Sequence, residues 1–155
     1  MSDRKHDADA PPAADHPSEL GYGPMDSIHA ELDALLRECR GHGERDWVAL
    51  LSSLDDHLRE HFEAEDRWMS ETDFPPRDCH MDEHAAVLKS SSEVLALARS
   101  GDFTQAPIFV EELFRWFPGH ADYLDSALAA WMCKRQYGGK PVVLHRGART
   151  KPEAR

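Results

Sequence analysis

The sequence predicts an all-α protein, an antiparallel up-down-up-down bundle of four helices. Two observations predict this class. Apolar residues recur at spacings of three and four in four successive stretches, at about residues 25–40, 44–71, 78–100 and 107–137. The alternating pattern of strands is almost absent, and the connections are short, which favours antiparallel neighbours.

The first two helices have distinct apolar faces and distinct ends. Ile28, Leu32 and Leu36 lie on one side of the first helix, which should stop at Gly41, where a left-handed turn is tolerated. The second helix is long, and the break at 74–76, Phe-Pro-Pro, ends it. Its inner stripe consists of Trp47, Leu50, Leu51, Leu54, Leu58, His61, Glu65 and Trp68.

The third and fourth helices follow the same rules. Gly101 should end the third, and Pro107 suits the first turn of the fourth because its missing N–H has no helical partner there. Pro118 lies inside the fourth helix, where it removes a backbone hydrogen bond and clashes with the carbonyl of Phe114, so we expect a kink. The inward residues of the third helix are His80, His84, Val87, Leu88, Val94, Leu95 and Ala98.

Composition divides the chain into three segments. We expect a flexible N-terminal extension at 1–23, the bundle at 24–137 and a basic, flexible tail at 138–155. The net charge is -11, yet from Lys134 onward there are seven Lys or Arg and one Glu, so acidic groups concentrate in the body. An acidic body argues against nucleic-acid binding by the domain.

The sequence also indicates a compartment. Cys39, Cys79 and Cys133 are odd in number and far apart, which matches neither a disulfide framework nor a paired-cysteine zinc site. The first 23 residues lack the regions of a secretory signal, and no run approaches the roughly 18 apolar residues of a membrane helix. We therefore expect a soluble, cytoplasmic protein without an integral membrane segment.

Ionisable side chains fall on the helix faces that should be buried. Buried charge must be paired or metal-bound. Two of the helices carry pairs four residues apart, which point the same way and can converge on a metal in the bundle. Imidazole with some carboxylate suits iron, copper or zinc better than magnesium or calcium. The residues are His29, then His61 with Glu65, His80 with His84, and His120.

Four motifs match a known family. They read MDSIH at 25–29, HFEAE at 61–65, HMDEH at 80–84, and WFPGH at 116–120 followed by Asp125. In these motifs the chain resembles the hemerythrins, specifically the single-domain bacterial ones, over about residues 24–131. The resemblance implies a four-helix bundle with a non-haem di-iron centre that binds dioxygen reversibly, as an oxygen carrier, store or local supplier and not primarily as an enzyme.

The resemblance also implies a role for each ligand. Two iron ions would share an oxo or hydroxo bridge from solvent, and the iron with fewer histidines would keep a position for dioxygen. By this reading His80, His84 and His120 bind one iron, His29 and His61 bind the other, and Glu65 and Asp125 bridge both.

Some residues fit less directly. Asp125 follows His120 by five positions, about 140° apart on an ideal helix, so its assignment rests on the resemblance. His57, one turn before His61, should pack or hydrogen bond beside the ligands. Cys79 should be a small residue near a helix start and not a redox sensor. Aromatic residues flanking the ligands should be partly core and partly pocket wall: Phe62, Trp68, Trp116 and Phe117.

Two other functions stay open. One is an enzyme that consumes peroxide or nitric oxide, or repairs iron centres. The other is a sensor whose contact with a partner changes with dioxygen or redox state. Histidine-rich ligation favours reversible binding over both, since carboxylate-rich di-iron sites leave more open positions and tend to activate oxygen.

Overall fold

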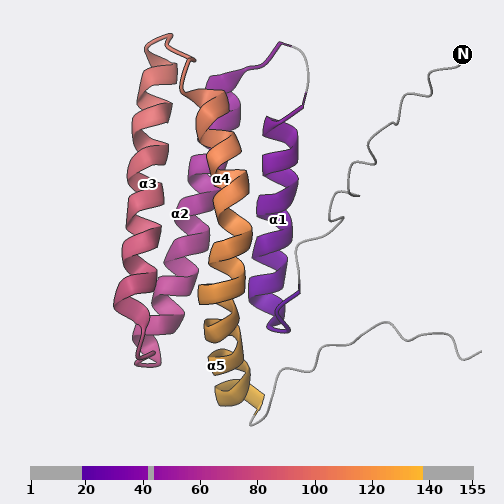
Figure 1. Cartoon of the computed structure of the whole chain (residues 1–155), viewed down its shortest axis with the longest axis vertical. Coiled ribbons are helices and arrows are strands. Elements are labelled where there is room, and N and C mark those ends of the chain that lie inside the picture. The colour runs from indigo at the N-terminus through magenta and orange to yellow at the C-terminus, as the bar shows by residue number, and fades with distance from the viewer. Residues whose placement is uncertain (1–18, 42–43, 138–155) are drawn as a thin grey trace, which may run out of the picture.

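The computed structural model describes residues 19–41 and 44–137, and within these it consists of helices without strands (Figure 1). The predicted bundle is confirmed: α1 packs against α2 and α4, and α3 packs against α2 and α4, in alternating directions. The last three elements follow one another as a single rod (Figure 1). The bounds are α1 Gly23–Cys39, α2 Trp47–Glu71, α3 Arg77–Arg99, α4 Ala106–His120, the π-helix η1 Ala121–Asp125, and α5 Ser126–Tyr137.

The helix starts differ from the prediction for local reasons. Helix α1 begins two residues earlier than predicted, and the carboxylate of Asp26 accepts hydrogen bonds from the N–H groups of Leu20 and Gly21 at 2.8 and 3.1 Å. The predicted start of α2 at residue 44 is wrong, because Asp46 caps this helix by accepting from the N–H of Ala49 at 3.1 Å. A side-chain cap therefore accounts for the start of α2, whereas α1 begins without one.

The helix ends follow the prediction more closely. Helix α2 stops at Glu71, and Asp73 after it has a φ of 52°. Gly101 follows α3 with a φ of 91°, the left-handed conformation that glycine adopts without strain. The predicted ends of the second and third helices are thus confirmed to within a residue.

The apolar core forms two clusters. The first is built around Leu32, Leu54, Leu58 and Leu113, and the second around Met25, Met69 and Leu128. The stripe predicted for α2 is confirmed at its centre, but Trp47, Leu50 and Trp68 are only half-buried, whereas Phe62 and Met69 are fully buried in their place. Between the two clusters the bundle holds a layer of polar side chains.

The rod formed by α4, η1 and α5 does not break at Pro118. The helix continues through this proline to His120 and then widens into the five-residue π-helix Ala121–Asp125 before α-helix resumes at Ser126. The irregularity in this rod is therefore a change from α-helix to π-helix that begins three residues beyond the proline.

The division into extension, bundle and tail stays a prediction, because residues 1–18 and 138–155 lie outside the described part of the chain. Tyr22, which precedes the predicted start of the bundle, is buried and its ring lies edge-on to that of Trp68 at 5.2 Å. Among the described helices, none is long and apolar enough to cross a membrane.

Packing of the first cluster should dominate the stability of the bundle. Leu54 is fully buried, so Leu54→Ala should lower the free energy of unfolding by about 2–5 kcal/mol, through lost apolar burial and the cavity left behind. Urea denaturation followed by far-ultraviolet circular dichroism measures this change. Ile108→Ala, at a half-exposed position, is the control and should change it by less than about 0.5 kcal/mol. Equal losses in the two variants would contradict the described core.

Candidate metal centre

The polar layer contains all seven side chains predicted to bind metal. They come from all four helical segments of the bundle, α1, α2, α3 and the rod formed by α4, η1 and α5. Each of the seven residues is at most 4 % exposed. Helix α1 supplies His29, α2 supplies His61 and Glu65, α3 supplies His80 and His84, and the fourth rod supplies His120 and Asp125. The structure thus brings together residues up to 96 positions apart in sequence.

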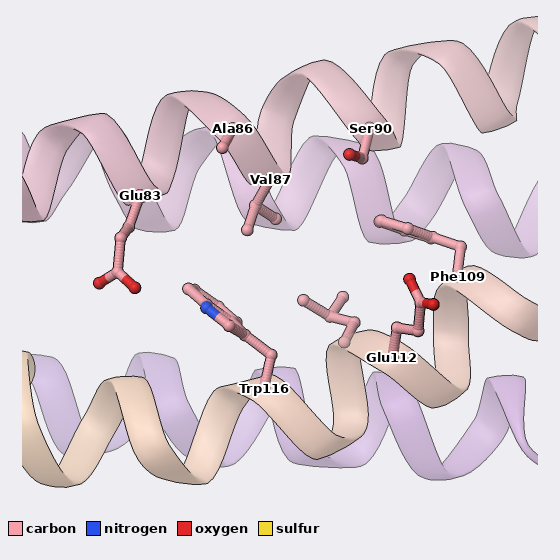
Figure 2. Close-up of a pocket in the computed structure, with 8 residues that line it drawn as sticks. Glu83, Ala86, Val87, Ser90, Phe109, Glu112 and Trp116 are labelled. Atoms are coloured by element: carbon pink, nitrogen blue, oxygen red, sulfur yellow. The ribbon is translucent and has the colours of Figure 1, made fainter.

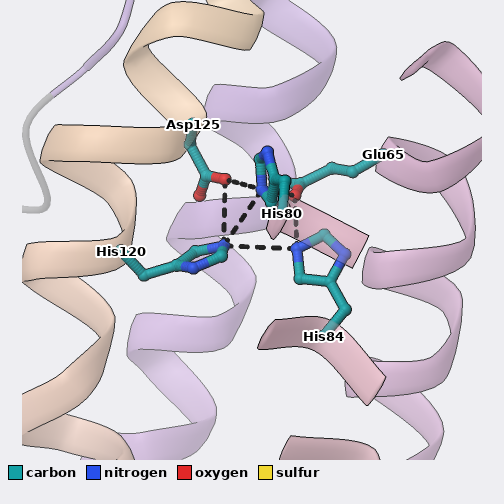
Figure 3. A group of neighbouring side chains, drawn as sticks. All are labelled: Glu65, His80, His84, His120 and Asp125. Atoms are coloured by element: carbon teal, nitrogen blue, oxygen red, sulfur yellow. Dashed lines mark hydrogen bonds and ion pairs between the residues drawn. The ribbon is translucent and has the colours of Figure 1, made fainter. Parts of the chain in front are cut away.

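The seven residues form two groups whose potential ligand atoms lie within 4.8 Å of one another. Both groups contain Glu65 and Asp125. One group adds three histidines, His80, His84 and His120, and is shown in Figure 3; the other adds His29 and His61. We call these the three-histidine group and the two-histidine group.

In the three-histidine group the Nε2 atoms converge. Nε2 of His120 lies 3.2 Å from Nε2 of His80 and 3.2 Å from Nε2 of His84 (Figure 3). Oδ1 of Asp125 lies 2.8 Å from Nε2 of His80 and 3.1 Å from Nε2 of His120. Oε2 of Glu65 lies 3.2 Å from Nε2 of His84. Nitrogen and oxygen ligand atoms therefore face one common point.

The two-histidine group uses the other oxygen of each carboxylate. Oδ2 of Asp125 lies 3.0 Å from Nε2 of His29, and Oε1 of Glu65 lies 2.8 Å from Nε2 of His61. Each carboxylate thus sends one oxygen to each group, which is the arrangement that lets a carboxylate bridge two metal ions.

The π-helix explains how Asp125 reaches this layer. Five residues on an α-helix rotate the side chain to the wrong face, but η1 spans the interval from Ala121 to Asp125 with the wider pitch of i→i+5 hydrogen bonds. Residues five apart then lie much closer to one face than they do on an α-helix. His120 and Asp125 consequently face the same site.

Several ligand atoms in this layer are buried without a hydrogen bond. They include Nε2 of His29, Oε2 of Glu65 and both carboxylate oxygens of Asp125, although nitrogen atoms lie close to each. Unsatisfied buried polar groups are rare in native proteins and need a partner. A cation in each group supplies that partner, and imidazole with carboxylate is a ligand set for iron, zinc or copper. The residues therefore fit a metal site.

The comparison with protein families agrees with this geometry. A family model, the Hemerythrin HHE cation binding domain, matches residues 20–132. The chain belongs to the hemerythrin family. A relative described as a bacteriohemerythrin, from Ralstonia nicotianae (strain ATCC BAA-1114 / GMI1000), is 36% identical over 116 residues, covering 75% of this chain and 85% of the relative. No solved structure matches the chain.

Contacts between the buried carboxylates and histidines of this site shift their pKa values. Burial alone would raise the pKa of Glu65, but contacts with the surrounding histidines hold it well below its usual value. Burial alone would also raise the pKa of Asp125, but contacts with His120, His29 and His80 lower it. Burial lowers the pKa of His29 and His80, yet the carboxylates outweigh it and raise both to about 9. Protons therefore balance the carboxylates when no metal is bound, and metal must displace them.

Aromatic rings pack against the candidate ligands, as partly predicted. The ring of Phe62 stacks on His84 at 4.1 Å, Trp116 stacks on His120 at 4.3 Å, and Phe117 lies edge-on to His29 at 5.0 Å. Trp68 instead belongs to the second apolar cluster. Three of the four named aromatic residues thus touch ligands.

His57 belongs to neither ligand group. Its ring lies edge-on to that of His61 at 5.5 Å, and its Nδ1 lies 3.8 Å from Oε2 of Glu31. Burial, together with repulsion from His61 and His29, lowers the pKa of His57 to about 4. This position beside the ligands confirms the predicted packing role.

The three cysteines are free, so no disulfide is formed. Cys79 is exposed near the start of α3, whereas Cys39 and Cys133 are buried. Burial raises the pKa of Cys39 to about 11, which keeps this thiol protonated and unreactive.

Sequence reasoning missed three carboxylates that lie at or near the candidate site or are buried between helices. Asp66 and Glu83 contact the outer nitrogens of ligand histidines, at 2.7 Å for His84 and 3.2 Å for His120. Asp55 is buried between α2 and α3, where it accepts a hydrogen bond from Ser91 at 2.7 Å. Asp66 and Glu83 directly follow or precede a ligand in sequence, which was the available signal; Asp55 gave none.

Metal binding should stabilise the fold, because the site exists only in the folded chain. Adding ferrous iron without air at 100 times its dissociation constant should contribute about 2.7 kcal/mol for each site that fills. This corresponds to a rise in Tm of roughly 5–15 °C by circular dichroism. Asp125→Asn should reduce the rise, whereas Asp122→Asn, exposed on the same π-helix, should not. An unchanged Tm in the native chain would contradict a metal site.

Proposed function

We propose that this hemerythrin binds dioxygen reversibly at a non-haem di-iron centre, as an oxygen carrier, store or local supplier. One observation carries the proposal: two buried groups with five imidazoles between them share both carboxylates. That arrangement suits two metal ions held side by side. The name bacteriohemerythrin, borne by the relative from Ralstonia nicotianae, agrees with it.

Each residue has a role in holding the pair. His80, His84 and His120 would hold one iron, His29 and His61 the other, and Glu65 and Asp125 would bridge both, together with an oxo or hydroxo group from solvent. When bound, the iron pair supplies the two electrons that reversible dioxygen binding requires. The two-histidine group contributes one nitrogen fewer, which would leave one coordination position on that side for a small ligand.

Burial of the ligands supports reversible binding over turnover. The seven side chains are at most 4 % exposed, and Phe117 lies edge-on to both His29 and His61, at 5.0 and 6.3 Å between ring centroids. Apolar packing on this side excludes water and anions, which would otherwise promote oxidation of the iron. The residues thus favour uptake and release of an uncharged ligand.

Visible spectroscopy tests the proposal directly. Protein loaded with ferrous iron without air should develop a ligand-to-iron charge-transfer band when air is admitted, and the band should fade under argon. A band that never forms, or that decays at once to a stable ferric spectrum, would contradict oxygen carriage. Rapid steady-state consumption of peroxide or nitric oxide would instead indicate an enzyme, and a protein partner gained or lost with dioxygen would indicate a sensor.

The bridging carboxylate should be needed for two irons. In Glu65→Gln one anionic oxygen is replaced by an amide nitrogen that cannot ligate, so iron content should fall from two per chain to one or fewer. Iron and protein assays on gel-filtered samples measure the ratio. Glu63→Gln, an exposed position on the same helix, is the matched control and should keep two irons. Two irons in both variants would sink the bridging role.

A further inference from the structure

The outer nitrogens of the ligand histidines are held unequally. Nδ1 of His84 donates to Oδ1 of Asp66 at 2.7 Å, and Nδ1 of His120 donates to Oε2 of Glu83 at 3.2 Å. Both of these histidines belong to the three-histidine group. A proton held on Nδ1 leaves the lone pair on Nε2, the atom that faces the site.

Each of these two rings is also held by an aromatic neighbour. Phe62 stacks on His84 with 7° between the ring planes, and Trp116 stacks on His120 with 30°. Figure 2 shows Glu83 on α3 and Trp116 on α4 facing each other at one end of a groove of about 310 Å³. A ring with one hydrogen-bonded edge and one covered face has little freedom to rotate.

The braces run from helix to helix around the bundle. Asp66 on α2 holds a histidine of α3, and Glu83 on α3 holds a histidine of α4. Each carboxylate lies next to a ligand of its own helix, Glu65 or His84. On both α2 and α3, one turn of helix therefore supplies a candidate metal ligand and also a carboxylate that holds a histidine of the adjacent helix.

In the two-histidine group, none of the described carboxylates contacts an outer nitrogen. Nδ1 of His61 is buried without a hydrogen-bond partner in the described part of the chain, and none of the described carboxylates bonds Nδ1 of His29. In the three-histidine group only His80 has an unbonded Nδ1. Two of the three rings in the three-histidine group therefore have a described carboxylate on Nδ1, and neither ring of the two-histidine group has one.

We propose that Asp66 and Glu83 are positioning residues that make the three-histidine group the tighter metal site, the first to fill and the last to empty. This inference rests on the metal centre proposed above. Carboxylates bonded to the outer nitrogen of a ligand histidine fix its tautomer and orientation and raise its basicity, and their loss typically lowers metal affinity about 10–100-fold.

Asp66 should matter more than Glu83. Its contact with histidine is shorter, 2.7 Å against 3.2 Å, and its side chain is 30% exposed against 43% for Glu83. Solvent weakens the more exposed pair. The effect of removing Asp66 should therefore lie toward the upper end of that range, and the effect of removing Glu83 toward the lower end.

Release of ferrous iron to excess bipyridine, followed without air by the absorbance of the coloured complex, tests the order. The native chain should release its two irons in two phases of equal amplitude. Asp66→Ala and Glu83→Ala should accelerate the slow phase about 10–100-fold and leave the fast phase unchanged. Asp66→Asn, which keeps an acceptor oxygen but loses the charge, should give an intermediate rate.

Matched controls separate positioning from general damage. Asp56→Ala on α2 and Asp82→Ala on α3 remove exposed carboxylates from the same helices and should leave both phases unchanged. Circular dichroism of the metal-free variants should show native helix content, so that a faster slow phase reports ligand positioning and not loss of fold.

The outcomes distinguish this inference from the proposed function. A single phase in the native chain, or a slow phase that survives removal of both Asp66 and Glu83, would overturn the inference even if two irons bind and respond to air. Two-phase release altered as expected, without a reversible response to air, would support the inference and refute oxygen carriage.

Discussion

Two carboxylates and five imidazoles share one buried layer, and the need to neutralise them constrains the whole bundle. Moving an ion out of water costs several kcal/mol, which is recovered only with well-placed partners. The shared oxygens of Glu65 and Asp125 give the histidines partners on both sides. Two metal ions would complete the compensation, so the candidate metal site is also the point where the fold needs a ligand.

The layer of candidate ligands lies between the two apolar clusters, and packing of these clusters fixes where each ligand sits. On α1, His29 lies between Met25 of one cluster and Leu32 of the other, and on α2, His61 and Glu65 lie between Leu58 and Met69. Apolar packing above and below therefore sets the height of each ligand. The stacked and edge-on rings then set its rotation, which leaves little reorganisation for metal binding to require.

Backbone irregularity and side-chain bracing solve two separate geometric problems. An unbroken α-helix cannot direct both His120 and Asp125 inward, and the π-helix Ala121–Asp125 provides the extra rotation. A lone imidazole can turn or change tautomer, and the carboxylates of Asp66 and Glu83 prevent this for two rings.

The sequence by itself determined the helices, their inward faces and six of the seven candidate ligands, because three-and-four spacing places such residues on one face whatever the tertiary structure. Asp125 required the family resemblance, since spacing alone pointed it away. Only the tertiary structure decided the rest: the start of α2 at its Asp46 cap, the π-helix, the buried Asp55 and the braces from Asp66 and Glu83. The braces and the burial of Asp55 depend on contacts between helices, and periodicity along one helix carries no information about what the adjacent helix presents. The Asp46 cap and the π-helix are local features of the backbone, which the spacing of apolar residues does not specify.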